Sequence, residues 1–135
     1  MTDFPVTIFH NPDCGTSRNV LAAVEAQGYA PKVVLYLESG WTALQLTDLV
    51  VRMGVPVRAV LREKGTPAET LGLLDPAVSD ETLISAMVEH PILVNRPIVE
   101  TPLGVVMARP SERVFEVLDR RPETFVKEDG EVVVL

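Results

Sequence analysis

The sequence predicts an α/β domain built on one mixed four-stranded sheet, and three observations support this prediction. Strand and helix patterns follow one another as strand–helix–strand near the start of the chain and as strand–strand–helix near its end. Between them, from about 42 to 90, the pattern indicates helices separated by proline and glycine. The chain has 135 residues, of which 47% are apolar, so it is long enough to bury one hydrophobic core.

The first half of the sheet is predicted from two apolar runs, at 6–9 and at 33–37. Residues 17–27 lie between these runs and have a helical pattern, which Gly28 closes. Two neighbouring strands joined by a helix pair in parallel, with a right-handed crossover. This part of the chain is therefore predicted to form a parallel βαβ unit.

Two amphipathic helices are predicted in the middle of the chain. The first ends at Gly54 and carries apolar residues spaced by three and four positions, namely Leu46, Leu49, Val50 and Met53. The second begins with Ser79 as its N-cap, has acidic residues in its first turn, and stops before Pro91. We interpret the stretch from about 42 to 90 as a helical insertion.

The last part of the chain is predicted to form a hairpin and a final helix. Strand patterns at 97–100 and 105–108 flank the turn sequence Thr101-Pro102-Leu103-Gly104. Ser111 is expected to cap the helix that follows. The tail, from about 122 to 135, is charged and ends in a short apolar run, which fits either an extra strand or a frayed terminus.

A βαβ half and a ββα half that share one four-stranded sheet form the thioredoxin-like arrangement, here with the helical insertion between the halves. We therefore predict one domain over residues 1–135. Proteins with this arrangement carry a cis-proline before the third strand, facing the active-site cysteine, and Pro97 falls at that place. This resemblance implies that Arg96 lies beside Cys14.

Composition and charge narrow the possible classes of function. The net charge of −7 argues against a general binder of nucleic acid or of anionic membranes. The chain has no apolar run of about 18 residues, the length that a membrane span needs, and its start does not resemble a signal peptide. A single cysteine excludes an internal disulfide, so we expect a reducing compartment, most simply the cytoplasm.

Cys14 lies in the predicted turn between the first strand and the first helix. Free N–H groups and the dipole at the start of a helix favour an anion, and they favour thiolate over thiol. A lone cysteine is more often a small, inert, buried residue, but the turn-forming neighbours of Cys14 favour a loop. We predict that Cys14 is reactive and that the residues after it bind an anion: Gly15, Thr16, Ser17 and Arg18.

The charges next to Cys14 support the same prediction. Positive charge on His10 and Arg18 would lower the pKa of the thiol. His10 could equally be a hydrogen-bonded residue at the end of a strand. Since His10 and His90 are the only histidines, they are too few for a strong metal site.

Three arginines have settings that suit an oxyanion: Arg62, Arg96 and Arg109. A guanidinium offers a planar fork of donors that matches tetrahedral oxyanions. Any one arginine is more often a solvated surface residue or a member of an ion pair. The spacing of the three in the sequence does not show that they meet.

Taken together, these motifs resemble the glutaredoxin-coupled arsenate reductases of bacteria. The resemblance runs from Thr7 to about Gly130, and its most specific parts are the Cys14 loop and Asn95-Arg96-Pro97-Ile98. The matching segments are 10–19, 35–38, 57–62, 90–99, 101–104 and 109–112.

The resemblance implies an enzyme that reduces arsenate to arsenite. It assigns Cys14 as the nucleophile and His10 as a support for the thiolate. It assigns three arginines to oxyanion binding and transition-state stabilisation: Arg62, Arg96 and Arg109. It also implies glutathione as co-substrate and glutaredoxin as partner, without a bound cofactor or metal. The lack of a second cysteine independently requires an outside thiol for turnover.

Other thiol chemistries make different demands on the sequence. A phosphatase-type arsenate reductase needs Cys-x5-Arg, but Val20 stands where the arginine would be. The regulators of the same superfamily typically carry Cys-x-x-Cys, but Ser17 stands at the second position. A glutathione-dependent thiol/disulfide reductase without arsenate activity stays open, as does a redox-sensing regulator.

Overall fold

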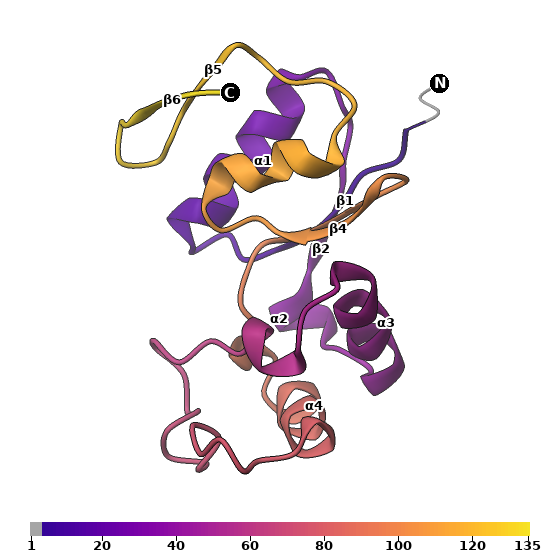
Figure 1. Cartoon of the computed structure of the whole chain (residues 1–135), viewed down its shortest axis with the longest axis vertical. Helices are drawn as coiled ribbons and strands as arrows, with labels where there is room; N and C mark the ends of the chain where they lie inside the picture. Colours follow the sequence, from indigo (N-terminus) through magenta and orange to yellow (C-terminus); the bar gives the residue numbers. More distant parts are fainter. Residues whose placement is uncertain (1–3) are drawn as a thin grey trace. The chain divides into compact units, whose positions relative to one another are not determined.

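The computed structural model describes residues 4–135, which form two compact units. The first unit contains the chain up to Leu35 together with Arg96–Leu135, and the second contains Tyr36–Asn95. The first unit thus combines both ends of the chain, coloured indigo to violet and orange to yellow in Figure 1. The second unit begins before, and ends after, the insertion that the sequence predicts at about 42–90.

The first unit is built on a four-stranded sheet with the strand order β2-β1-β3-β4. Its strands are β1 (Thr7–His10), β2 (Lys32–Leu35), β3 (Ile98–Thr101) and β4 (Gly104–Met107). Strand β1 pairs in parallel with β2 and antiparallel with β3, which pairs antiparallel with β4. The predicted mixed sheet of thioredoxin-like type is confirmed, with Cys14 following one of its two central strands.

Two helices cover the hydrophobic core of the first unit. Helix α1 (Gly15–Ala26) and the 3-10 helix η3 (Ser111–Val117) run side by side in Figure 1. Alternate strand residues, such as Ile8 and Val99, point to the face that α1 covers with Val20 and Val24. All four of these side chains are fully buried, so the closely packed core fixes β1 and α1, the two elements that the Cys14 loop connects.

The charged tail ends in a second, two-stranded sheet. Strand β5 (Thr124–Val126) pairs antiparallel with β6 (Val132–Val134). Phe125 is buried against Phe115 of η3, with ring centroids 5.3 Å apart in an edge-to-face arrangement. Of the two alternatives for the apolar end of the chain, the extra strand is therefore the right one.

Two predicted details are wrong. The second strand ends at Leu35, and Tyr36 begins the short helix α2 (Tyr36–Ser39), because the fully buried Tyr36 ring packs in the second unit and donates a hydrogen bond to the carbonyl of Val94. Ser111 does not cap the last helix from outside but is its first residue, after Pro110. The Ser111 hydroxyl bonds instead to Glu128 in the tail.

The second unit contains the two predicted amphipathic helices. Helix α3 (Ala43–Met53) is capped by Thr42 and ends at Gly54, whose φ of 71° is easily adopted only by glycine. Helix α4 (Asp80–Glu89) is capped by Ser79, as predicted. The 3-10 helices η1 (Val57–Val60) and η2 (Pro91–Leu93) complete this unit, and a bridge between Leu61 and Val94 joins the segments that follow them.

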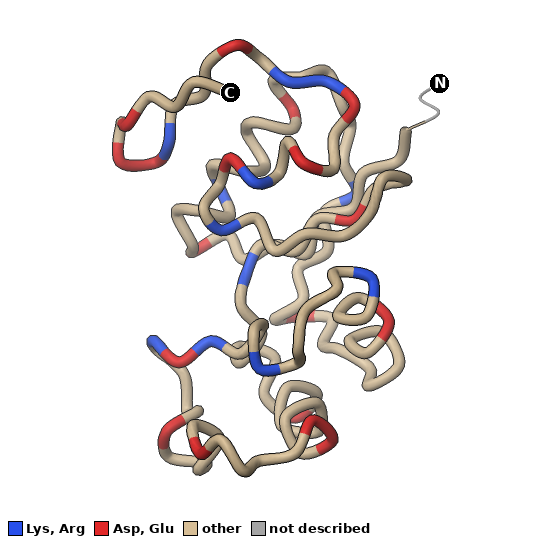
Figure 2. The backbone as a smooth tube through the Cα atoms, viewed as in Figure 1, with Lys and Arg blue, Asp and Glu red and all other residues tan. Residues whose placement is uncertain are grey.

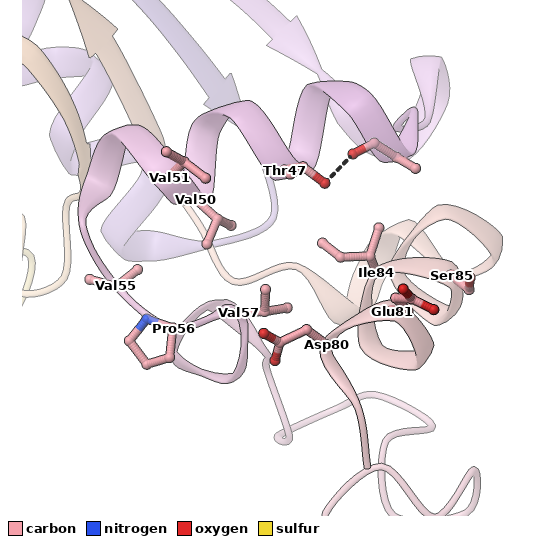
Figure 3. A pocket seen from close by; sticks show the side chains of 11 residues that line it. Thr47, Val50, Val51, Val55, Pro56, Val57, Asp80, Glu81, Ile84 and Ser85 are labelled. Atoms are coloured by element: carbon pink, nitrogen blue, oxygen red, sulfur yellow. Dashed lines mark hydrogen bonds between the residues drawn. The ribbon is translucent and has the colours of Figure 1, made fainter.

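A groove of about 610 Å³ lies between α3, η1 and the start of α4. Figure 3 shows its valine and isoleucine side chains, with Asp80 and Glu81 at its edge. None of the site residues that the sequence predicts lines this groove. Within residues 4–135, no helix has the length and apolar character needed to cross a bilayer.

Candidate active site

Cys14 lies between β1 and α1 and is the N-cap residue of the helix. The backbone N–H of Cys14 donates to the carbonyl of Asn11 at 3.1 Å, and the N–H of Asp13 donates to Asn11 Oδ1 at 2.9 Å. The Asn-Pro-Asp sequence before the cysteine favours this compact turn, because an asparagine side chain can bond the backbone two residues on. The loop therefore places the thiol at the start of α1, where the helix dipole favours negative charge.

Two arginines and one backbone amide bind the sulfur. Arg109 Nη1 donates to Cys14 Sγ at 3.6 Å and also to the carbonyl of Arg96 at 3.0 Å. The Arg96 side chain and the backbone N–H of Ser17 complete the hydrogen bonds to the sulfur. The Arg96–Pro97 peptide is cis and Arg96 lies beside Cys14, as the thioredoxin-like resemblance implies. The Arg109–Pro110 peptide is cis as well.

These contacts give the thiol an acidic character. Cys14 is only 8% exposed, and burial alone raises the pKa of its thiol. The hydrogen bonds from Arg96, from the N–H of Ser17 and from Arg109 outweigh burial and lower the pKa to about 7. Cys14 is thus buried among donors that stabilise thiolate.

The positive charge at the sulfur is local. Figure 2 shows acidic and basic residues interspersed along the whole chain, and the net charge is −7. Arg96 is itself buried, at 9% exposure, and Arg109 is half-buried. Because buried charges are screened less by solvent than exposed ones, these two guanidinium groups act on Cys14 despite the negative net charge of the chain.

His10, the last residue of β1, is hydrogen-bonded to the loop through Ser17. Its Nδ1 lies 2.7 Å from Ser17 Oγ, and the same oxygen accepts a hydrogen bond from the N–H of Asn11 at 3.1 Å. Burial first, and the charge of Arg18 second, lower the pKa of His10. The lowered pKa disfavours a positive imidazole near the sulfur and fits the alternative, a hydrogen-bonded residue at the end of a strand. His10 acts on Ser17, whose backbone N–H bonds the sulfur.

The other residues of the predicted anion loop have distinct positions. Arg18 turns back and donates from Nη1 to the carbonyl of Pro12 at 2.9 Å. Gly15 and Thr16 begin α1. Thr16 also lines a polar hollow of about 270 Å³ together with Arg109, Pro110, Ser111, Lys127, Glu128 and Asp129.

Arg62 belongs to the second unit. Its Nε donates to the carbonyl of Lys64 and its Nη1 to Asn95 Oδ1, both at 3.1 Å. The backbone N–H of Arg62 donates to the carbonyl of Leu93 at 2.7 Å. Arg62 therefore bonds to Asn95, the residue before Arg96 in the sequence. Arg96 and Arg109, by contrast, both bond to the Cys14 sulfur.

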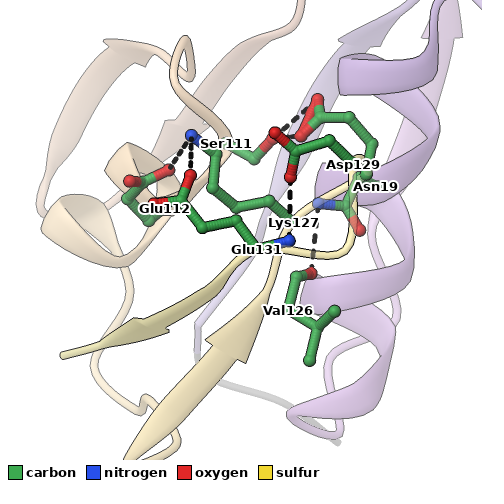
Figure 4. A network of polar contacts seen from close by, with 8 residues as sticks. Asn19, Ser111, Glu112, Val126, Lys127, Asp129 and Glu131 are labelled. Carbon is green, nitrogen blue, oxygen red and sulfur yellow. Dashed lines mark hydrogen bonds and ion pairs between the residues drawn. The ribbon is translucent and has the colours of Figure 1, made fainter.

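Three residues with clear roles at the loop were not predicted as site residues: Asn11, Ser111 and Glu128. Asn11 was recognisable, because asparagine two residues before another turn residue is a common turn signal. Figure 4 shows the network in which Ser111 and the tail take part. The tail has no periodic pattern, so nothing local indicates that Glu128 meets Ser111, 17 residues earlier.

The described part of the chain, residues 4–135, contains no group of three or more His, Cys, Asp or Glu side chains arranged to hold a metal ion.

Comparisons with known proteins agree with this geometry. The model of the ArsC family matches residues 9–117. The chain is 51% identical to "Arsenate reductase ArsI1" of Synechocystis sp. over 99% of this chain and 94% of that protein. It is 50% identical to an arsenate reductase of Escherichia coli over 96% of this chain and 92% of that protein.

A solved structure of an arsenate reductase is similar to this chain in fold. The arsenate reductase from Vibrio cholerae superposes with a TM-score of 0.83 at 42% identity, covering 87% of this chain and all of that one. The family match includes Cys14, Arg96 and Arg109, the three residues that meet at the sulfur. By sequence and by fold, this chain belongs to the ArsC family.

Proposed function

We propose that this protein reduces arsenate to arsenite with glutathione and glutaredoxin, in the cytoplasm. The observation that carries the proposal is the pair of guanidinium groups, Arg96 and Arg109, bonded to a thiol of low pKa at a helix start. This arrangement supplies a nucleophile and an oxyanion cradle in one place. Relatives about 50% identical over nearly the whole chain are named arsenate reductases, which supports arsenate as the substrate.

In the first step, the Cys14 thiolate attacks arsenic. An S–As bond forms, one As–O bond breaks, and the leaving oxygen departs as water after it is protonated. Arg96 and Arg109 bind the remaining oxygens through their planar forks and stabilise the negative charge of the transition state. The resemblance adds Arg62 as a third anion-binding group. Gly15, Thr16, Ser17 and Arg18 form the anion loop, with the backbone N–H groups at the start of α1 as donors.

In the second step, glutathione supplies the electrons. The thiolate of glutathione attacks Cys14 Sγ, an S–S bond forms, and the electron pair of the S–As bond stays on arsenic. Arsenic(V) thereby becomes arsenic(III) and leaves as arsenite, while two thiols have become one disulfide. A glutaredoxin thiolate then attacks the glutathione sulfur and returns Cys14 as thiolate. Since Cys14 is the only cysteine of the chain, no internal thiol can do this.

The test is an arsenite assay on the purified protein with arsenate, glutathione and glutaredoxin, in which each component is omitted in turn. We expect sustained arsenite only in the full mixture, and a Cys14–glutathione adduct by mass spectrometry when glutaredoxin is left out. Reduction of glutathione mixed disulfides without any arsenite would reject the proposal. It would favour the thiol/disulfide reductase that shares the same cysteine. Reversible oxidation of Cys14 without turnover of either substrate would instead favour a redox-sensing regulator.

A further inference from the structure

The turn of the C-terminal hairpin brings one carboxylate, Glu128, to the active-site loop. Thr16 donates a side-chain hydrogen bond to Glu128. The Ser111 hydroxyl lies 2.9 Å from Glu128 Oε1 and 3.1 Å from Oε2. Thr16 is two residues after Cys14, and Ser111 is two residues after Arg109. One carboxylate thus joins the segment that carries the thiol to the segment that carries an arginine bonded to it.

The hairpin holds Glu128 firmly in this place. The side chain of Lys127 lies 3.8 Å from Glu112 of η3, which anchors the turn, whereas its contact with the exposed Glu131, at 3.6 Å, lies within the turn and anchors nothing outside it (Figure 4). The backbone N–H of Lys127 donates to the carbonyl of Glu131 at 2.8 Å, and the N–H of Gly130 donates to the carbonyl of Lys127 at 3.0 Å. Phe125 before the turn is buried on η3, and Leu135 after it packs against the same core, so both strands of the hairpin are attached to the core of the first unit.

The hydrogen bonds to the Cys14 sulfur depend closely on the positions of the two segments that Glu128 joins. The bond from Arg109 to the sulfur is 3.6 Å long, near the limit for a sulfur acceptor, and the Ser17 N–H that bonds the sulfur follows Thr16 directly. Small displacements of either segment therefore weaken the donors that hold the thiolate. Ser111 is fully buried, so its segment moves only if its hydroxyl loses its acceptor or its packing changes.

We infer that Glu128 is a positioning residue for the nucleophile: by accepting hydrogen bonds from both Thr16 and Ser111, it holds the Cys14 loop against Arg109. It touches neither the thiol nor the anion in this role. The charged side chains that share its hollow are Arg109, Lys127 and Asp129. The effect on the thiol stands independently of the substrate, whereas the effect on turnover rests on the proposed function.

The direction in which the pKa of Cys14 changes when Glu128 is replaced separates a positioning role from a purely electrostatic one. A carboxylate near a thiolate disfavours the charged form, so removing its charge would by itself lower the pKa of Cys14. Loss of positioning weakens the Arg109 and Ser17 donors and raises that pKa. The substitutions Glu128→Ala and Glu128→Gln remove the same charge, but Gln keeps one acceptor oxygen. Positioning therefore predicts a larger rise for Ala than for Gln, and electrostatics predicts an equal fall for both.

The experiment measures the rate of Cys14 alkylation by iodoacetamide between pH 5 and 9 on the full chain. We expect the midpoint to rise by about 0.5 pH or more in Glu128→Ala, with a smaller rise in Glu128→Gln. In the arsenite assay, kcat should fall about threefold or more in Glu128→Ala. Ser111→Ala should raise the midpoint as well, and adding it to Glu128→Ala should have little further effect, because both remove the same contact.

The matched control is Glu131→Gln. Glu131 pairs with the same Lys127 and lies in the same turn, but it is not among the residues bonded to Glu128. Its midpoint and kcat should match those of the wild type. An unchanged or lowered midpoint in Glu128→Ala would overturn the inference, even if the variant melts at a lower temperature, and so would an equal rise in Glu131→Gln. A wild-type protein that makes no arsenite would reject the proposed function alone, because the alkylation midpoint needs no arsenate.

Discussion

At the scale of single residues, the site depends on the competition between burial and hydrogen bonding at one sulfur. Burial raises the pKa of Cys14, and two arginines with one backbone amide lower it further than burial raises it. The family resemblance implied that Arg96 lies beside Cys14 and placed Arg109 in the same site, and the structure brings both arginines to the sulfur, although their spacing in the sequence does not show that they meet. The sequence did not predict that the pKa of His10 is lowered, because burial and a hydrogen-bond partner seven residues away are not visible in a local pattern.

The nucleophile itself gives the first prediction. In wild-type protein, alkylation of Cys14 should follow a single titration with its midpoint at about pH 7, since the thiolate is the reacting form. Cys14→Ser should abolish both alkylation and arsenite production while leaving the circular dichroism spectrum unchanged. A thiol that reacts only above pH 8.5, or not at all in the native protein, would mean that Cys14 is an inert buried residue.

The second prediction concerns the two arginines that bond the sulfur. Arg109→Ala and Arg96→Ala should each raise the alkylation midpoint and lower turnover by about 10²-fold, because both remove a donor to the thiolate and, in the proposed mechanism, to the oxyanion. Lysine at either position should restore only part of the activity, since an ammonium cannot form the planar fork. Arg113→Ala is a suitable control, because Arg113 pairs with Glu116 on the surface of η3. Kinetics like those of the wild type in both Ala variants would remove the oxyanion cradle from the mechanism.

At the scale of elements, the loop between β1 and α1 is stabilised from within. The fully buried Ser17 hydroxyl contacts both His10 Nδ1 and the N–H of Asn11, so it ties the end of β1 to the first turn of α1. Helices α3 and α4 and the β3–β4 hairpin were predictable, because caps, glycines and spacing are local signals. The end of β2 and the role of Ser111 were not, because long-range contacts from Tyr36 and Glu128 decide them.

Ser17→Ala tests this loop. It removes the acceptor for a buried N–H, so the free energy of unfolding should fall by about 1–3 kcal/mol. Because the Ser17 backbone N–H also bonds the sulfur, the alkylation midpoint of Cys14 should rise. Ser79→Ala, which removes only the cap of α4, should lower stability by about 1 kcal/mol without changing the thiol. The two effects are measured by urea denaturation and by alkylation, and equal thiol midpoints in both variants would contradict the prediction.

At the scale of the whole molecule, the low pKa of Cys14 links stability to pH. The thiol titrates at about 7 when folded and near its ordinary 9.0 when unfolded. Below pH 7 both states hold the proton, and between pH 7 and 9 only the unfolded state does. The free energy of unfolding should therefore rise across that window, by up to about 2.5 kcal/mol. Subtracting the urea-denaturation profile of Cys14→Ser isolates this contribution, and a flat difference would show that the thiol titrates alike in both states.

The two-unit organisation also has a consequence for biosynthesis. Cys14 is made early, but the groups that acidify it, Arg96 and Arg109, follow after the entire second unit, and Glu128 follows later still. A chain on the ribosome that ends before Arg96 lacks both arginine donors, so its thiol is less acidic than in the folded protein and more fully protonated at neutral pH. Both donors are present only after β4, the strand that pairs with β3, has been made. A copy truncated before Arg96 therefore carries a less reactive sulfur than the complete fold.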